Sequence, residues 1–468
     1  MRGRAGLGLS FVQLAYLPFL ALVLGLYWAV RDRLLQNVIL VVASGVFYGW
    51  VHPWFLTLLY GSCLLDWASA LGMVKWPRRK NLFLGVSLVG NLGLLGTFKY
   101  FDFFATSVQA ALASLGIHAS LPLLQLALPA GISFYTFQTL SYTIDVWRGH
   151  IAPRPSLLDF TVFVSLFPQL VAGPVERARD LLPQVEAPRR WETNVFAEGI
   201  DLCLRGAVWK IVVADTVGMF VDRVFLLPAP QFWVLWAGVL GFTVQILADF
   251  GGYTLIARGS ARMIGFRLVE NFRSPYLATS PAEFWRRWHV SFSSWIHEYV
   301  YLPVRGDAPT PLRRTLATFV SMSVSGLWHG ASWNFVLWGL WHAVLLTGHR
   351  GWSALRRPLP RWVAVPLMFS ATMTAWLLFR EHDLSRLVAH LGRSPLTTSY
   401  AEAATALAVA GISAVGGAVL WISGRAAVPA SLSPRTAALL RGVGWAAAVA
   451  LVVLFARDTT RDFLYFRF

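Results

Sequence analysis

The sequence predicts an all-α, polytopic membrane protein, and three observations lead to that prediction. Hydrophobic residues make up 56% of the 468-residue chain, and the mean hydropathy is +0.56. Charged residues make up only 13%, whereas soluble domains carry about 25%. Many apolar runs also approach the roughly 20 residues that a helix needs to cross a bilayer.

Apolar runs follow one another along the chain with short polar connections. Their ranges are 11–30, 34–50, 54–74, 82–98, 123–144, 157–171, 232–250, 315–328, 334–346, 362–379, 403–422 and 439–455. Several are shorter than a span requires, so we expect about eleven true membrane helices. Residues 195–225 carry many charges among apolar residues, which predicts a helix packed inside the protein and not one facing lipid. Basic and aromatic residues at 258–273 and 284–302 predict interfacial helices there. No connection is long enough for a soluble domain, which predicts a single membrane domain over residues 1–468.

The net charge of +17 is carried by short basic clusters between the apolar runs, such as residues 75–80. This pattern is typical of cytoplasmic loops and contacts with anionic lipid, and it does not indicate nucleic-acid binding. The alternative for any one cluster is that its charges simply lie in a solvent-exposed loop. The two cysteines, Cys63 and Cys203, provide neither a disulfide framework nor a metal-ligand spacing. We therefore predict no metal centre.

The most informative stretch is residues 326–333, Gly-Leu-Trp-His-Gly-Ala-Ser-Trp, within a run from Thr315 to Gly348 that has no Asp, Glu, Lys or Arg. Its glycines, Ser332 and Asn334 are poor helix formers beside the ionisable ring of His329. Broken backbone at membrane depth persists only where it is buried in protein or lines a wet cavity. An intramembrane histidine is a functional-site hypothesis, and a histidine hydrogen-bonded between helices is the alternative.

A second histidine lies in residues 284–289, Phe-Trp-Arg-Arg-Trp-His. Aromatic residues recur from here at steps of three and four, which predicts one helix over 284–302 with a single aromatic face. His289 follows Trp285 by one turn and is expected at the edge of that face. Ordinary aromatic anchoring at a membrane surface is the alternative for this stripe.

These residues suit acyl transfer. A neutral imidazole accepts the proton of an attacking hydroxyl, and the hydroxyl oxygen then attacks a thioester or ester carbonyl. Asn334, Ser332 or backbone N–H groups near Gly330 are candidates to stabilise the oxyanion. A zinc site at His289 and His329 would need further ligands. His342 and His349 are candidates by residue type, but no helix-face spacing joins them to His329. From physical chemistry alone, the same histidines could also form the proton relay of a transporter, so that interpretation stays open beside an enzyme.

Several motifs resemble the membrane-bound O-acyltransferase (MBOAT) family, and within it the bacterial branch of alginate O-acetyltransferases and D-alanyl transfer proteins. The matching segments are 91–101, 131–138, 145–149, 167–174, 270–276, 284–289, 326–333 and 463–468. Together they extend over nearly the whole chain.

The resemblance implies membrane helices around a central funnel, with His329 as the catalytic histidine and His289 as a second histidine beside it. Trp285, Arg286, Arg287, Trp288 and Trp328 match motif positions and are predicted to support the site or its tunnel. It also implies an O-acyltransferase of the cell (inner) membrane, moving an acetyl group toward an exported polysaccharide. The donor would be acetyl-CoA or an acyl carrier protein, with no bound cofactor, and an extracytoplasmic acyltransferase would be the partner. D-alanyl transfer to teichoic acid and a non-catalytic transporter or scaffold are the alternatives.

Three positions depart from the family pattern. His297 replaces an expected Arg, Arg305-Gly306-Asp307 replaces Gly-Gly-Asn, and Leu255 replaces an expected Asp. These changes do not touch either motif histidine, and we expect them to affect docking of the donor or partner.

Overall fold

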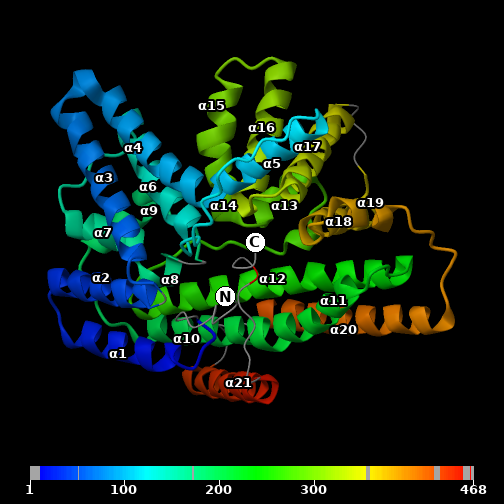
Figure 1. Cartoon of the computed structure of the whole chain (residues 1–468). Helices are drawn as coiled ribbons and strands as arrows, with labels where there is room; N and C mark the ends of the chain where they lie inside the picture. The colour runs from blue at the N-terminus through cyan, green and yellow to red at the C-terminus, as the bar shows by residue number, and fades with distance from the viewer. Residues whose placement is uncertain are drawn as a thin grey trace. The chain divides into compact units, whose positions relative to one another are not determined.

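The computed structural model describes residues 11–50, 52–170, 173–354, 359–425, 433–456 and 464. Every regular element within these ranges is a helix (Figure 1), which confirms the predicted all-α class. Residues 171–172 and most of the terminal motif 463–468 lie outside the described residues. The chain divides into two compact units, of which the first contains Met1–Phe196, Ala261–Val269 and Gly330–Ser332. The single domain over 1–468 stays a prediction.

In its described residues, the first unit contains nine α-helices and two short irregular helical segments. They are α1 (Tyr16–Ala29), α2 (Arg33–Gly49), α3 (Phe55–Lys75), η1 (Pro77–Arg79), α4 (Lys80–Leu95), η2 (Gly96–Tyr100), α5 (Phe101–Ser114), α6 (Ile132–Arg148), α7 (Leu157–Ser165), α8 (Phe167–Leu170) and α9 (Ala178–Glu186).

The second unit contains the remaining helices, apart from the ends of α10 and α12 that fall in the first unit. They are α10 (Thr193–Ala207), η3 (Val208–Ala214), α11 (Asp215–Leu226), α12 (Phe232–Met263), η4 (Pro275–Leu277), α13 (Pro281–Arg287), α14 (Val290–Ile296), η5 (His297–Tyr301), α15 (Leu302–Arg305), α16 (Pro311–His329), α17 (Trp333–Ala354), α18 (Arg361–Arg380), α19 (Leu384–Leu391), α20 (Tyr400–Arg425) and α21 (Pro434–Phe455).

Six helical stretches of the described chain are long and apolar enough to cross a membrane. They are Phe55–Lys75, Pro77–Ser114, Phe232–Met263, Arg361–Arg380, Tyr400–Arg425 and Arg435–Phe455. The helices α1 and α2 are apolar but shorter. Helices able to span a membrane are therefore present in the described chain, whereas the expected number of about eleven is not confirmed.

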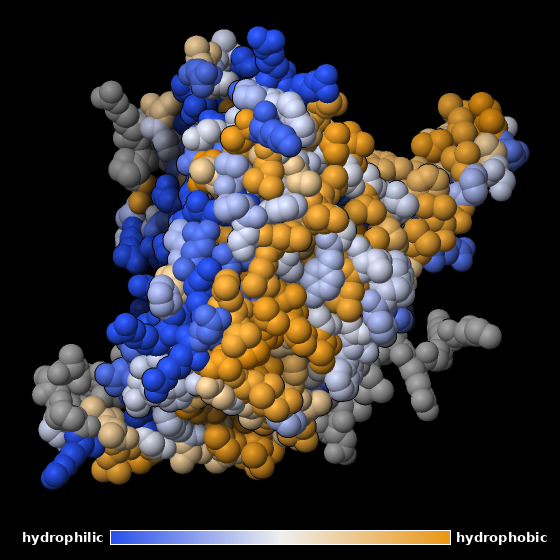
Figure 2. All heavy atoms as spheres, turned by 90° about the vertical axis from the view of Figure 1, so that its left-hand side faces the viewer, coloured by the Kyte–Doolittle hydropathy of each residue, from blue (hydrophilic) through white to orange (hydrophobic). Residues whose placement is uncertain are grey.

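Large apolar side chains remain exposed along these stretches, among them Leu82, Val89 and Leu92 of α4. Figure 2 shows hydrophobic side chains gathered in a broad area on one face, beside a band of hydrophilic side chains. Apolar patches of this kind mark surfaces that contact membrane or protein. Such exposed apolar faces are consistent with helices that contact lipid.

Two predicted helices have different bounds in the structure, because a glycine precedes the start of one and follows the end of the other. The predicted helix over 123–144 begins only at Ile132, since Pro129 and the left-handed Gly131, with a φ of 74°, precede it. The predicted interfacial helix over 258–273 is wrong. α12 continues to Met263, and Gly265, with a φ of 91°, starts an irregular segment. A positive φ strains any residue with a Cβ and is readily adopted by glycine.

A buried carboxylate holds three helices of the first unit together. Asp66 of α3 accepts hydrogen bonds from the Ser87 hydroxyl of α4 and, at 3.1 Å, from the Thr143 hydroxyl of α6. Asn91 Nδ2 of α4 donates to Asp66 Oδ2 at 2.8 Å. All four side chains are fully buried. Buried polar groups need such partners because desolvation is otherwise uncompensated.

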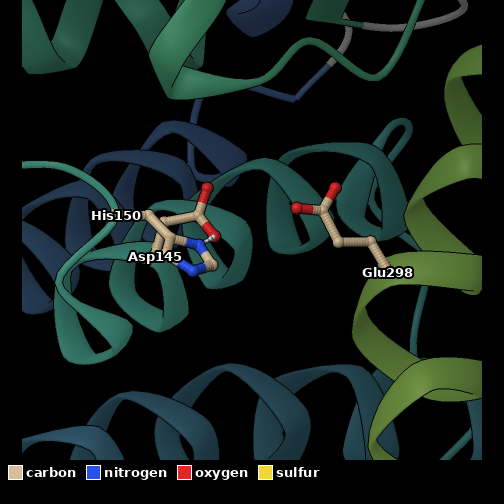
Figure 3. Close-up of side chains that lie close together, drawn as sticks. All are labelled: Asp145, His150 and Glu298. Carbon is tan, nitrogen blue, oxygen red and sulfur yellow. Dashed lines mark ion pairs between the residues drawn. The ribbon is translucent and has the colours of Figure 1, made fainter.

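The end of α6 carries a second polar pair of the first unit. Figure 3 shows the ring of His150 beside the carboxylate of Asp145, with a Nδ1–Oδ1 distance of 3.6 Å. The left-handed Gly149, with a φ of 79°, turns the chain so that the His150 N–H donates to the Asp145 carbonyl at 2.9 Å. Glu298, also drawn there, belongs to the second unit. The 145–149 motif therefore ends a helix.

The helices α16 and α17 of the second unit cross with their backbones in contact. A Cβ added at Gly326 would lie 2.1 Å from the Phe335 carbonyl oxygen, and one at Gly339 would lie 2.2 Å from that of Met322. Small residues allow this approach between helices. The contact fixes the end of α16, where His329 lies, against the start of α17.

We predict that Gly339→Ala lowers thermal stability in detergent, because the added methyl group meets backbone that cannot move aside. The expected cost is roughly 1–3 kcal/mol, as for other overpacked positions. Gly348→Ala in the same helix is the matched control, since a Cβ there meets nothing within 4 Å. Equal unfolding midpoints for the two variants would contradict the close crossing.

Candidate active site

His289 lies at a break between two short helices. α13 ends at Arg287, α14 begins at Val290, and His289 adopts left-handed backbone angles of 43° and 54°. The predicted single helix over 284–302 is therefore wrong. Its aromatic periodicity persists, but the ring of His289 is directed by the turn and not by a continuous helix.

Asn271, from the irregular segment after α12, replaces the missing N-cap of α14. Its carbonyl accepts the Val290 N–H at 3.0 Å, and its Oδ1 accepts the Ser291 N–H at 3.2 Å and the Ser291 hydroxyl at 2.7 Å. Satisfying these N–H groups stabilises the helix start. The backbone around His289 is thus held by a residue 18 positions earlier in the sequence.

His329 is the last residue of α16, and residues 330–332 join it to α17. The break predicted from glycine and polar residues at this position is confirmed. The Ser332 N–H donates to the Gly330 carbonyl at 3.0 Å within the turn. Helix termination here leaves His329 buried, with 4% of its surface exposed.

The two histidines share one pair of aromatic rings in the second unit. The rings of Phe292 and Trp328 lie 4.2 Å apart, centre to centre. His289 lies 5.0 Å from Phe292 and 5.7 Å from Trp328, and His329 lies 5.7 Å and 4.9 Å from the same two rings. The structure therefore brings the two predicted catalytic residues into one site, from segments 40 positions apart.

A third buried histidine, His342, extends this site, whereas the sequence indicated it only as a candidate zinc ligand by residue type. His342 of α17 lies 4.8 Å from Trp338, whose ring lies 4.9 Å from His329. It also stacks on Phe284 at 5.8 Å and contacts Trp285 at 4.9 Å. The spacing of four between Trp338 and His342, on one helix face, was the available signal.

The electrostatic setting of His289 keeps its ring neutral. The side chain is 1% exposed, and neither ring nitrogen has a hydrogen-bond partner among the described residues. Burial lowers the pKa of His289 from 6.5 to about 3, because a low-dielectric surrounding disfavours the charged form. A neutral imidazole has a free nitrogen lone pair, which a proton acceptor requires.

The tryptophans among the predicted support residues form the walls of the site. Trp288 is buried, and its ring stacks on Phe284 at 5.8 Å and packs on Trp376 at 4.8 Å. Trp285 packs edge-on against Trp338 at 5.8 Å. Together with Trp328, these rings exclude water from the histidines, and excluding water strengthens electrostatic interactions in a site.

The predicted polar support residues Arg287 and Asn334 make different structural contacts. Arg287 donates to Glu283 at 2.6 Å and to the carbonyls of Arg273 and Ser274 at 3.5 and 3.4 Å, so it holds the loop before α13. Asn334 donates its amide to the carbonyls of Leu378 and Phe379 at 3.3 Å. That contact ties α17 to the end of α18.

Arg286 is exposed and faces a cavity of about 660 Å³. The cavity is lined by Trp285 and Phe292 of the aromatic site and by serine hydroxyls of α14 and α16. Arg273 and Arg350 add positive charge to its wall. An arginine-lined cavity that reaches an aromatic wall of a histidine site suits a ligand with phosphate groups and a long arm.

Comparison with known proteins shows the family to which the chain belongs. A model of the membrane-bound O-acyltransferase family matches residues 148–379. The probable alginate O-acetylase of Azotobacter vinelandii is 39% identical over 379 residues, which cover 78% of this chain and 74% of that protein. This chain belongs to the membrane-bound O-acyltransferase family. It is a multi-pass membrane protein and an O-acyltransferase.

Two further relatives show the range of this MBOAT branch. The peptidoglycan O-acetyltransferase of Helicobacter pylori is 32% identical, over 76% of this chain and 72% of that protein. The teichoic acid D-alanyltransferase of Bacillus subtilis is 25% identical, over 50% of this chain and 63% of that protein. The family predicted from the motifs is therefore confirmed, and the O-acetyltransferases are the more similar relatives.

One departure from the MBOAT pattern lies in the cavity wall. His297, at the expected Arg position, lines the same cavity as Arg286. Burial and the nearby Arg305, another departing residue, lower the pKa of His297. The substitution replaces a permanent positive charge with a mostly neutral ring at neutral pH.

We predict that folding stability falls as the pH drops below about 6.5, because of His289. The unfolded chain binds a proton there with a pKa near 6.5, whereas the folded protein leaves the ring neutral until about pH 3. Since the unfolded state binds more protons in this window, stability decreases by up to about 1.4 kcal/mol per pH unit.

Unfolding midpoints at pH 7.5 and 5.0 test this linkage. His289→Gln is expected to reduce the loss at the lower pH, whereas His118→Gln, at an exposed position, is expected to retain it. An equal loss in the wild type and in His289→Gln would contradict burial of a neutral ring.

Proposed function

We propose that this protein transfers an acetyl group from a cytosolic thioester donor toward an exported polysaccharide, with His329 and His289 at the reacting centre. One observation carries the proposal: both histidines are buried against the same two rings, Phe292 and Trp328. The acetyl group and polysaccharide acceptor are supported by the names of the relatives, an alginate O-acetylase and a peptidoglycan O-acetyltransferase.

In the proposed reaction, His329 is the general base. Its neutral imidazole accepts the proton of the acceptor hydroxyl while that oxygen attacks the thioester carbonyl. The tetrahedral intermediate then collapses, the C–S bond breaks, and the leaving sulfur takes the proton back from the imidazolium as a thiol. His289, held neutral by burial, assists as a second proton acceptor.

The oxyanion formed in this step needs hydrogen-bond donors. Asn334 directs its amide to two backbone carbonyls of α18, which supports an architectural role for it. The Ser332 hydroxyl and backbone N–H groups near Gly330 stay donors predicted from the sequence; of these, the Ser332 N–H already donates to the Gly330 carbonyl.

Acetyl-CoA or an acyl carrier protein is the proposed donor. Both carry a phosphate and a long pantetheine arm that ends in the thioester. The cavity lined by Arg273, Arg286 and Arg350 supports this assignment, because arginine binds phosphate oxygens in bidentate geometry. An inner-membrane location and an extracytoplasmic acyltransferase that completes transfer to the polymer belong to the same proposal.

D-alanyl transfer to teichoic acid is the second candidate function. It is supported by the Bacillus subtilis relative, at lower identity and over half of this chain. Incubating membranes with labelled acetyl-CoA or with a D-alanyl-loaded carrier protein distinguishes the two reactions by which label enters polymer.

We predict that His329→Ala lowers polymer acetylation by about 10²–10⁴-fold, the usual contribution of a general base. The measurement is ester content of the exported polymer, with the membrane level of each variant checked. His118→Ala is the matched control, since this histidine is exposed and outside the second unit. Acetylation retained by His329→Ala would overturn the catalytic assignment and favour a transporter or scaffold.

A further inference from the structure

A second cavity, of about 500 Å³, lies in the second unit beside α12 and α20. Its other lining residues are Arg205 of α10, Trp209 of η3, Arg287 of α13 and segment 270–277, which also supplies Asn271, the cap of α14. The proposed acetyl transfer uses none of the arginines from α10, α12 and α20 that line this cavity. Both α12 and α20 are among the candidate membrane spans.

The two long helices run in the same direction along the cavity. A Cβ at Gly241 of α12 would lie 3.1 Å from the Ser413 hydroxyl of α20, and one at Gly416 would lie 3.4 Å from Val244. Residue numbers therefore increase together along both helices. The lining residues near the C-terminal ends of α12 and α20 consequently lie at the same end of the cavity.

The cavity is apolar at one end and cationic at the other. Val244 and Leu247 line it near the middle of α12, and Leu420 lies just over one turn before the end of α20. Arg258, in the last two turns of α12, and Arg425, the last residue of α20, line its other end. Helix ends are where a span meets the headgroup region. An amphiphile with an anionic head and a hydrocarbon tail matches this division.

Positive charge dominates the polar end. Among the described residues, the lining contains five arginines and a single carboxylate, Glu270. Glu270 lies 3.8 Å from Arg258 and 3.5 Å from Arg273, and Arg287 pairs with Glu283 at 2.6 Å. These two carboxylates offset only part of the charge of the five arginines. Arg425 stacks on the ring of Trp421 at 4.2 Å, which orients a guanidinium while leaving its N–H edge available.

We propose that this cavity binds the phosphate headgroup of an anionic membrane phospholipid, with one acyl chain lying along α12 and α20. Basic pockets between membrane helices bind such headgroups. A lipid is favoured over a soluble phosphate compound because the apolar half of the cavity is built from two membrane spans. The bound headgroup also stiffens segment 270–277, since Arg273 and Ser274 line the cavity.

The test measures binding of phosphatidylglycerol to the purified full-length protein by native mass spectrometry and by the shift in its unfolding midpoint. Phosphatidylcholine, inorganic phosphate and CoA are the comparison ligands. The Arg258→Gln/Arg425→Gln double variant is expected to weaken binding by about fivefold for each arginine removed. Arg223→Gln, at an exposed position of α11 outside the lining, makes the same charge change and is expected to bind like the wild type.

The Arg258→Lys/Arg425→Lys variant keeps the charge and is expected to retain most of the binding. The proposal is supported if the wild type, Arg223→Gln and the double Lys variant bind phosphatidylglycerol more tightly than phosphatidylcholine and the double Gln variant does not. Three results would overturn it: equal binding of phosphatidylcholine, unchanged binding in the double Gln variant, or protection by inorganic phosphate or CoA equal to that by phosphatidylglycerol. Polymer acetylation is measured separately, so failure of this proposal leaves the acetyltransferase assignment intact.

Discussion

The contact between Phe292 and Trp328 is the interaction on which the histidine site depends. Phe292 comes from α14 and Trp328 from α16, and their rings lie 4.2 Å apart. Aromatic pairs combine large buried area with a preferred geometry. Because each ring also contacts both His289 and His329, the pair fixes two residues that neither helix would position alone. The packing of these aromatic rings therefore determines where the two histidines lie.

Local sequence signals predicted part of this arrangement. Glycine and polar residues after His329 indicated a helix end, and the structure has one there. The break at His289 was not predicted, because Trp285, Trp288 and Phe292 continue a helical period. That break is stabilised by Asn271, whose hydrogen bonds to α14 are tertiary contacts. A periodicity argument contains no information about such a distant partner, and the contact of His342 with Trp285 was missed for the same reason.

The arginines illustrate a second limit of sequence reasoning. Arg286 and Arg287 are neighbours in one motif, yet Arg287 holds a loop through Glu283 whereas Arg286 lines a cavity. Their positions on α13 separate them. In contrast, the membrane class and helical fold followed from composition alone, since burial of apolar helices in lipid is a bulk property. The fold class can thus be predicted from the average hydrophobicity of the chain, whereas the role of each site residue depends on its own contacts.

The central claim is that His289 and His329 act in one site, and a double-mutant cycle tests it most directly. Acetyl transfer is measured for the wild type, His289→Ala, His329→Ala and the double variant in membranes with matched protein levels. Residues that act as a unit are strongly non-additive. The account predicts that the double variant is scarcely slower than the more severe single variant. Losses that multiply, as for independent sites, would contradict it.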